Sequence, residues 1–129
     1  MGVVILPQPN DLSIAPDVEL WRRIPPWQWI PDSNTPTGRR PTSDAFDDIE
    51  LSVVIAVECE GGLGTLLAGH VGYGVASFTV GDIRDRGWGI VRVPDDELPG
   101  HAHVTGKKSH SKRASLAKKC TIRVEPPDA

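Results

Sequence analysis

The chain has 129 residues and a formal net charge of −3, and 39% of its residues are hydrophobic. This length fits one domain, and the apolar content with four tryptophans supports a folded core, which excludes a wholly disordered chain. No apolar stretch approaches the ~20 residues of a membrane-spanning helix. We therefore expect a single compact domain over residues 1–129 with no membrane partner, and with 1–18 and 125–129 as flexible ends.

The first half of the chain is expected to hold short strands between irregular segments. A β-branched run at Gly2–Leu6 and the segment Leu20–Ile24 are both typical of strands. Pro25 and Pro26 prevent a continuous helix after the second of these. The stretch Asp32–Asp44 is rich in turn-forming residues and is predicted to be a loop.

Ile49–Cys59 is predicted to be the central strand. It begins with alternating polar and apolar residues and then becomes continuously apolar, which is typical of a buried strand. The alternation places four side chains on one buried face: Leu51, Val53, Ile55 and Val57.

The second half alternates short helices and strands. The expected elements are a helical turn at 63–68, strands at 74–80, 88–93, 101–105 and 120–124, and helices at 81–87 and 109–119. This order predicts an α+β fold with a mixed β-sheet and two short helices, ending in a strand–helix–strand unit.

Cys59 and Cys120 are the only cysteines, and both border apolar runs. Two cysteines in a chain whose start lacks a signal-peptide pattern indicate reduced thiols and a cytoplasmic location. Metal sites usually contain closely spaced ligand pairs such as Cys-x-x-Cys, and the chain has none. The sequence therefore predicts no metal site, and nothing in it indicates a cofactor.

The charge is distributed unevenly. All five lysines and Arg113 lie between His101 and Lys119, a run without any acid. The run carries six positive charges while the chain totals −3, so the remainder carries −9. Such asymmetry is typical of a protein with an anionic partner or an acidic protein partner.

A turn within this run is a candidate anion-binding site. Glycine lets a backbone turn expose its N–H groups, and the start of a helix adds a partial positive charge. The turn leads from a predicted strand into a predicted helix, and the residues expected to contact the anion are Gly106, Lys107, Lys108, Ser109, Lys112 and Arg113. It is not a P-loop, because His101 stands where that motif requires a glycine.

The histidines are the candidate catalytic groups. His101 and His103 are two residues apart on a predicted strand and should face the same side. Paired imidazoles near lysines suit general acid–base catalysis on a phosphate ester. With Arg22 they would form the polar groups of an enzyme site.

The N-terminal half carries a partial resemblance. Leu-Trp-Arg-Arg-Ile at 20–24, followed by Arg-Arg-Pro-Thr-Ser-Asp-Ala-Phe at 39–46, resembles the opening of small ADP-ribosyltransferase-type domains. The resemblance covers 20–46 and implies that an arginine on a strand and a later serine hold NAD. It also implies a catalytic glutamate, for which Glu58 and Glu60 are the candidates. As a whole the chain resembles small bacterial proteins without an assigned activity.

Three functions follow from these features. The first is a small binding module that engages nucleic acid or a phosphate-bearing ligand through the C-terminal basic turn and helix. The second is an enzyme acting on a nucleotide or NAD-like substrate. The third is an accessory subunit that binds another protein.

Overall fold

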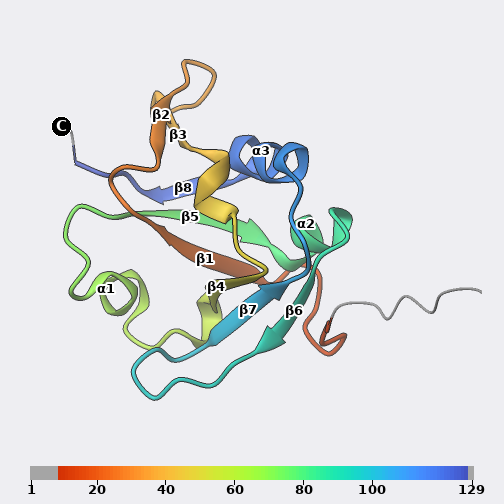
Figure 1. Ribbon diagram of the computed structural model, residues 1–129. Helices are drawn as coiled ribbons and strands as arrows, with labels where there is room; N and C mark the ends of the chain where they lie inside the picture. The colour runs from red at the N-terminus through yellow and green to blue at the C-terminus, as the bar shows by residue number, and fades with distance from the viewer. Residues whose placement is uncertain (1–8, 128–129) are drawn as a thin grey trace, which may run out of the picture.

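The computed structural model describes residues 9–127 and contains eight strands, three α-helices and two short 3-10 helices (Figure 1). The strands are β1 Glu19–Ile24, β2 Trp29–Pro31, β3 Arg39–Pro41, β4 Glu50–Ile55, β5 Gly74–Thr79, β6 Gly89–Arg92, β7 His101–Thr105 and β8 Thr121–Val124. The helices are η1 Ser43–Phe46, η2 Ala56–Glu58, α1 Gly62–Leu67, α2 Val80–Asp85 and α3 His110–Lys119. The α+β class expected from the sequence is confirmed.

Six strands form one sheet in the order β6-β7-β4-β1-β5-β8, and every pairing in it is antiparallel. This corrects the expected mixed sheet. Strands joined through a helix, such as β7 and β8, do run in the same direction. They are nevertheless separated in the sheet by three strands, β4, β1 and β5, so each bonds only to antiparallel neighbours.

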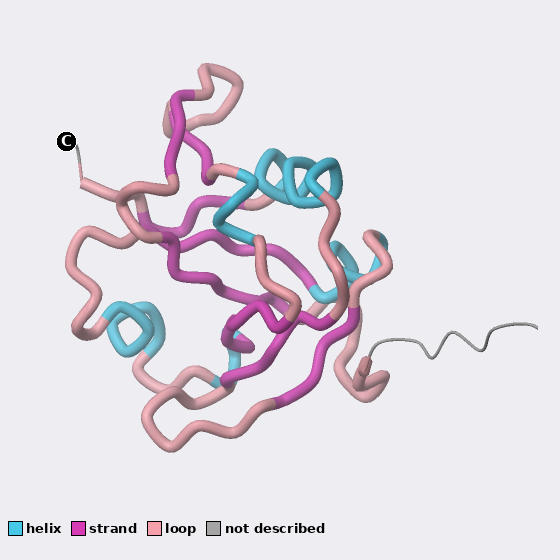
Figure 2. The backbone as a smooth tube through the Cα atoms, in the orientation of Figure 1, coloured by secondary structure: helices cyan, strands magenta, loops and turns pink. Residues whose placement is uncertain are grey.

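The two faces of the sheet are covered by different helices, as the tube in Figure 2 shows. On one face, Leu116 and Ala117 of α3 and Phe46 of η1 pack with the main apolar core, to which β1, β4 and β5 contribute. On the other face, Leu66 of α1 packs with Val54 and a smaller cluster. No helix in the described part of the chain is long and apolar enough to cross a membrane.

The central strand is confirmed, with one correction. Leu51, Val53 and Ile55 are at most 2% exposed, whereas Val57 is 85% exposed. The strand ends at Ile55 because Ala56–Glu58 turn into η2. This turn breaks the two-residue alternation, so Val57 leaves the face that the pattern predicted for it.

The expected short helices form, and a third accompanies them. α2 begins with a capping box in which Thr79 and Asp82 bond each other's backbone N–H, and the chain leaves it through Gly87 at φ +80°. α3 covers His110–Lys119, one residue shorter than the helix predicted at 109–119. The helical turn expected at 63–68 is α1, which starts at Gly62.

The segment expected to be a loop at Asp32–Asp44 contains β3, which pairs with β2 as a small separate hairpin. Residues 9–18, expected to belong to a flexible end, pack on the sheet: Asp11 N–H donates to the carbonyl of Ile90 at 2.7 Å, and Ile14 is buried. The strand predicted at Gly2–Leu6 lies outside the described residues.

Candidate functional site

β1 and β4 pair over only part of their length. They are paired at Leu20 with Ile55 and at Trp21 with Val54, and the pairing stops there. Beyond this point Arg22 takes the place of the missing ladder: its Nε donates to the carbonyl of Ala45 and its Nη1 to the carbonyl of Ser52, both at 2.8 Å. The guanidinium thus ties η1 and β4 to β1 where the two strands separate.

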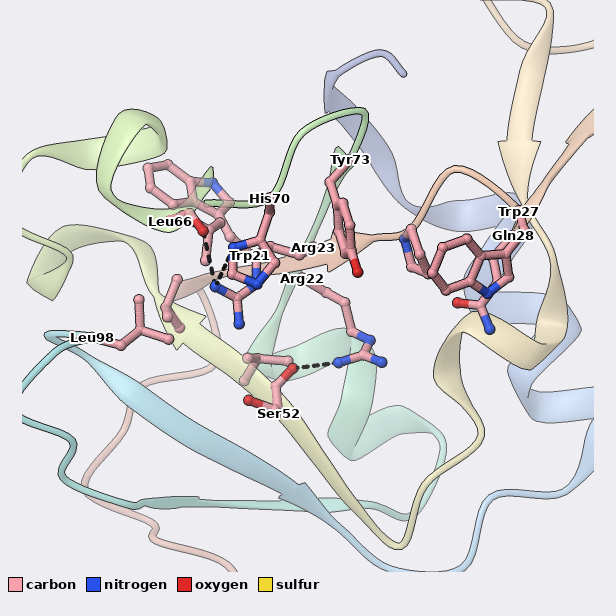
Figure 3. Close-up of a pocket in the computed structure, with 13 residues that line it drawn as sticks. Trp21, Arg22, Arg23, Trp27, Gln28, Ser52, Leu66, His70, Tyr73 and Leu98 are labelled. Atoms are coloured by element: carbon pink, nitrogen blue, oxygen red, sulfur yellow. Dashed lines mark hydrogen bonds between the residues drawn. The ribbon is translucent and has the colours of Figure 1, made fainter. Parts of the chain in front are cut away.

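A cavity of about 360 Å³ opens at this separation (Figure 3). Its volume is within the range of small-molecule sites. In the view of Figure 3, Trp21 and Leu66 lie toward one end, and Trp27 and Gln28 toward the other. The lining residues are Trp21, Arg22, Arg23, Pro25, Trp27, Gln28, Ser52, Val53, Val54, Leu66, His70, Tyr73 and Leu98.

The cavity wall is cationic. Arg22 and Arg23 both line it, and the lining contains no Asp or Glu. Burial lowers the pKa of Arg22 to about 10, so its guanidinium keeps its charge near neutral pH; Asp48 opposes this shift. Among the described residues, Nη2 of Arg22 has no hydrogen-bond acceptor, because its two bonds use Nε and Nη1. Two arginines on a cavity wall without any carboxylate are suited to a ligand with negative charge.

Arg23 is held beside α1 and its following loop. Its Nη1 donates to the carbonyl of Leu66 at 3.0 Å and lies 3.5 Å from Nδ1 of His70. The same Nδ1 lies 2.9 Å from the carbonyl of Ala68, which can only accept, so Nδ1 carries a proton. The approach of Arg23 to His70 is therefore a close contact and not a hydrogen bond, and burial lowers the pKa of Arg23.

Aromatic rings form a further part of the wall. Trp27 and Tyr73 meet edge to face at 6.3 Å between ring centroids, and His70 meets Tyr73 in the same way at 5.0 Å. Trp27 is 74% exposed, so much of its ring is available to a ligand. Gly72 at φ +83° turns the loop that presents His70 and Tyr73. Flat apolar faces beside arginines are suited to a planar ring that carries an anionic group.

Ser52 joins the cavity to the histidines of β7. Its hydroxyl lies 2.7 Å from Nε2 of His101, whose Nδ1 lies 2.8 Å from the carbonyl of Val93. His103 faces the same side, with its ring 5.1 Å from that of His101, and its Nδ1 is 3.8 Å from Glu50. Neither His101 nor His103 lines the cavity, and Lys107 does not either. The sequence predicted that both histidines and Arg22 would form one site. In the structure the histidines lie outside the cavity, and His101 reaches it only through its contact with Ser52.

The C-terminal basic turn is folded around its own lysine. Lys108 is only 6% exposed, and its ammonium donates to the carbonyls of Ile49, Val104 and Gly106 at 2.8–3.3 Å. It also lies 5.5 Å from the centre of the Trp88 ring. Burial lowers the pKa of Lys108 to about 8. Carbonyl oxygens point at this cation, so Lys108 holds the turn together and is not available to a bound anion.

The other residues expected at the anion site do not converge. Lys112 donates to the carbonyl of Arg86 at 2.8 Å, and Arg113 forms an ion pair with Asp47 at 2.7 Å. Ser109 precedes α3, but its side chain makes no capping bond, and Lys107 is exposed next to Gly106. Several positive charges of the basic run are therefore engaged in contacts within the protein.

The two segments that carry the ADP-ribosyltransferase-type resemblance are in contact, through the bond of Arg22 to the carbonyl of Ala45. The serine in the second segment turns elsewhere, since Ser43 Oγ lies 3.4 Å from Nδ1 of His110. Glu58 forms an ion pair with Arg92 at 2.7 Å, and neither Glu58 nor Glu60 lines the cavity. The implied use of NAD stays a prediction.

Several residues of the cavity were not anticipated from the sequence, chiefly Ser52, His70 and Tyr73. Ser52 had a usable signal, because it is a polar residue inside the most apolar strand. The described part of the chain contains no group of three or more metal-ligating side chains. Cys59 and Cys120 are free thiols, and burial raises the pKa of both. No family model, curated protein or solved structure matches the chain.

Proposed function

We propose that the protein binds a small phosphate-bearing ligand with a planar ring, a nucleoside phosphate in chemical class, in the cavity between β1 and β4. The observation that carries this proposal is the pair Arg22 and Arg23 on a wall without any carboxylate. A bound phosphate would receive charge-assisted hydrogen bonds from guanidinium groups, which are stronger than neutral ones. The proposal keeps the anionic ligand expected from the sequence and moves its site away from the C-terminal turn.

The aromatic residues of the cavity are the evidence for the planar ring of the proposed ligand. Trp27 offers an exposed ring face, and Tyr73 stands beside it. Stacking on such rings tolerates any base, so the site favours a class of ligand and not one base. The cavity volume of about 360 Å³ accommodates one small molecule and excludes a folded macromolecule.

The test is calorimetric titration of the protein with ADP, adenosine and inorganic phosphate. We expect ADP to bind more tightly than either of the other two, because only ADP offers both the ring and the charge. ADP binding should weaken as salt is added, since part of its affinity is electrostatic. Equal binding of ADP and adenosine would contradict a role for the arginines, and no binding of ADP would remove the proposal.

A further inference from the structure

Ser52 and His101 form a hydrogen-bonded pair whose proton positions follow from the contacts. They lie on the neighbouring strands β4 and β7, where His101 pairs with Val54, two residues along from Ser52. Nδ1 of His101 is 2.8 Å from the Val93 carbonyl, which can only accept, so Nδ1 holds a proton. In the neutral ring Nε2 is then unprotonated, and it accepts the Ser52 hydroxyl at 2.7 Å.

This arrangement contains the three parts of an activated nucleophile. A hydroxyl is bonded to a base, and the base is oriented by a third group, here a backbone carbonyl. Ser52 is also among the residues that line the cavity, so a ligand bound there would lie beside it. The Arg22 guanidinium is bonded to the backbone carbonyl of Ser52, so a positive group lies beside this residue.

We propose that Ser52 is a nucleophile and His101 its general base, and that they transfer the acyl group of a carboxylic ester whose remaining part carries an anionic group. The proposal rests on the proposed function for that anionic part, which the arginines of the cavity would hold. The class is acyl transfer because a serine–histidine pair supplies a nucleophile and a proton acceptor.

The proton and bond changes balance without a further reactant except water. Ser52 Oγ attacks the ester carbonyl carbon while His101 Nε2 takes the hydroxyl proton. The carbon–oxygen bond to the alcohol breaks, His101 gives its proton to the departing oxygen, and an acyl ester of Ser52 remains. Water then attacks that ester with His101 as base, the carboxylic acid leaves, and Ser52 regains its proton.

His103 provides a matched control. It lies on the same strand and faces the same side as His101, with the two rings 5.1 Å apart. Its Nδ1 lies 3.8 Å from the exposed Glu50, and it does not line the cavity. A general effect of losing a histidine from β7 would appear in both variants, whereas loss of the base would appear only for His101.

The experiment treats the full chain with 4-nitrophenyl acetate and follows nitrophenolate release, with peptide mapping of the acetyl adduct. We expect the adduct on Ser52, none at that position in S52A, and a rate in H101Q reduced by about 100-fold or more, while H103Q stays within about twofold of the unmodified protein. ADP should slow the acylation by occupying the cavity. The position of the adduct is determined on the unmodified protein, so this result does not depend on whether a variant folds.

Three results would contradict the assignment of Ser52 as nucleophile and His101 as base. They are the absence of an adduct on Ser52, an adduct confined to lysines, and an unchanged rate in H101Q. Titration with ADP separates this outcome from failure of the proposed function. If ADP binds but Ser52 is not acylated, the nucleophile is wrong and the binding function stands. If Ser52 is acylated but ADP neither binds nor slows the reaction, the reactive pair stands and the nucleotide site is wrong.

Discussion

Nη1 of Arg22 donates to the backbone carbonyl of Ser52 at 2.8 Å, across the place where β1 and β4 cease to pair. This bond sits where a ladder hydrogen bond between the two strands would otherwise lie. The side chain therefore closes the sheet on one side and forms part of the cavity wall on the other. Arg22 therefore contributes both to the stability of the fold and to the candidate site.

Replacing Arg22 by methionine should destabilise the protein. The change removes charge-assisted bonds to the carbonyls of Ala45 and Ser52 and leaves these acceptors without a donor. We expect the free energy of unfolding to fall by about 2–4 kcal/mol, measured by urea denaturation. R22K, which keeps a charge and a donor, should lose less, and equal losses in the two variants would argue against this role.

The central strand gives a prediction with an internal control. Ile55 is 1% exposed in the main core, whereas Val57 is 85% exposed in η2. I55A should lower the free energy of unfolding by about 2–4 kcal/mol because it opens a cavity. V57A should change it by less than about 0.5 kcal/mol. Similar denaturation midpoints for the two variants would show that Ile55 is not buried.

Lys108 should matter for stability and not for ligand binding. K108M leaves three carbonyls without their donor, so we expect a loss of about 1–3 kcal/mol in the free energy of unfolding at pH 7. K107M, a change in an exposed neighbour, should be within about 0.5 kcal/mol of the unmodified protein. If K107M costs as much as K108M, the buried bonds are not the cause.

The pKa of Lys108 adds a pH dependence of definite sign. Burial lowers this pKa from 10.5 to about 8, so between these pH values the unfolded chain holds the proton and the folded protein does not. The contribution of Lys108 to the free energy of unfolding is constant below pH 8 and rises with pH through this window. The stability difference between unmodified protein and K108M should therefore widen from pH 8 to 10. A constant or narrowing difference would contradict the lowered pKa.

The basic run should bind nucleic acid weakly. Lys108, Lys112 and Arg113 are engaged within the protein, which leaves three of the six cations, Lys107, Lys118 and Lys119, exposed and without such contacts among the described residues. Three phosphate contacts to duplex DNA correspond to a slope of about −2.7 in a plot of log affinity against log salt. Fluorescence anisotropy with a labelled duplex measures this slope, and a value near −5 would restore the run as the main anion site.

The sequence predicted those parts of the fold in which local pattern and burial agree. β7 begins and ends at the predicted residues His101 and Thr105, and α3 ends at the predicted Lys119. The hairpin of β2 and β3 was missed because its strands have three residues each, too few for an alternation to be visible.

The site was predicted only in its components. Arg22 and His101 were selected for their chemistry, but their grouping depends on where β1 and β4 separate, which is a tertiary feature. Lys108 was wrongly assigned to an anion site because its sequence context, a lysine after a glycine in a turn, is typical of such sites. The backbone carbonyls that bind its ammonium become visible only in the structure. Charge in a sequence does not show which charges are satisfied inside the fold.

The central claim is that an anionic ligand binds in the cavity lined by Arg22 and Arg23 and not on the C-terminal run. The most direct test is the affinity of ADP for R23Q and for K118Q, measured by calorimetry on folded protein. Arg23 lines the cavity and Lys118 does not, although each variant removes one positive charge. The account predicts that R23Q binds ADP about tenfold or more weakly and that K118Q binds it like the unmodified protein. Weakening by K118Q with no effect of R23Q would contradict it.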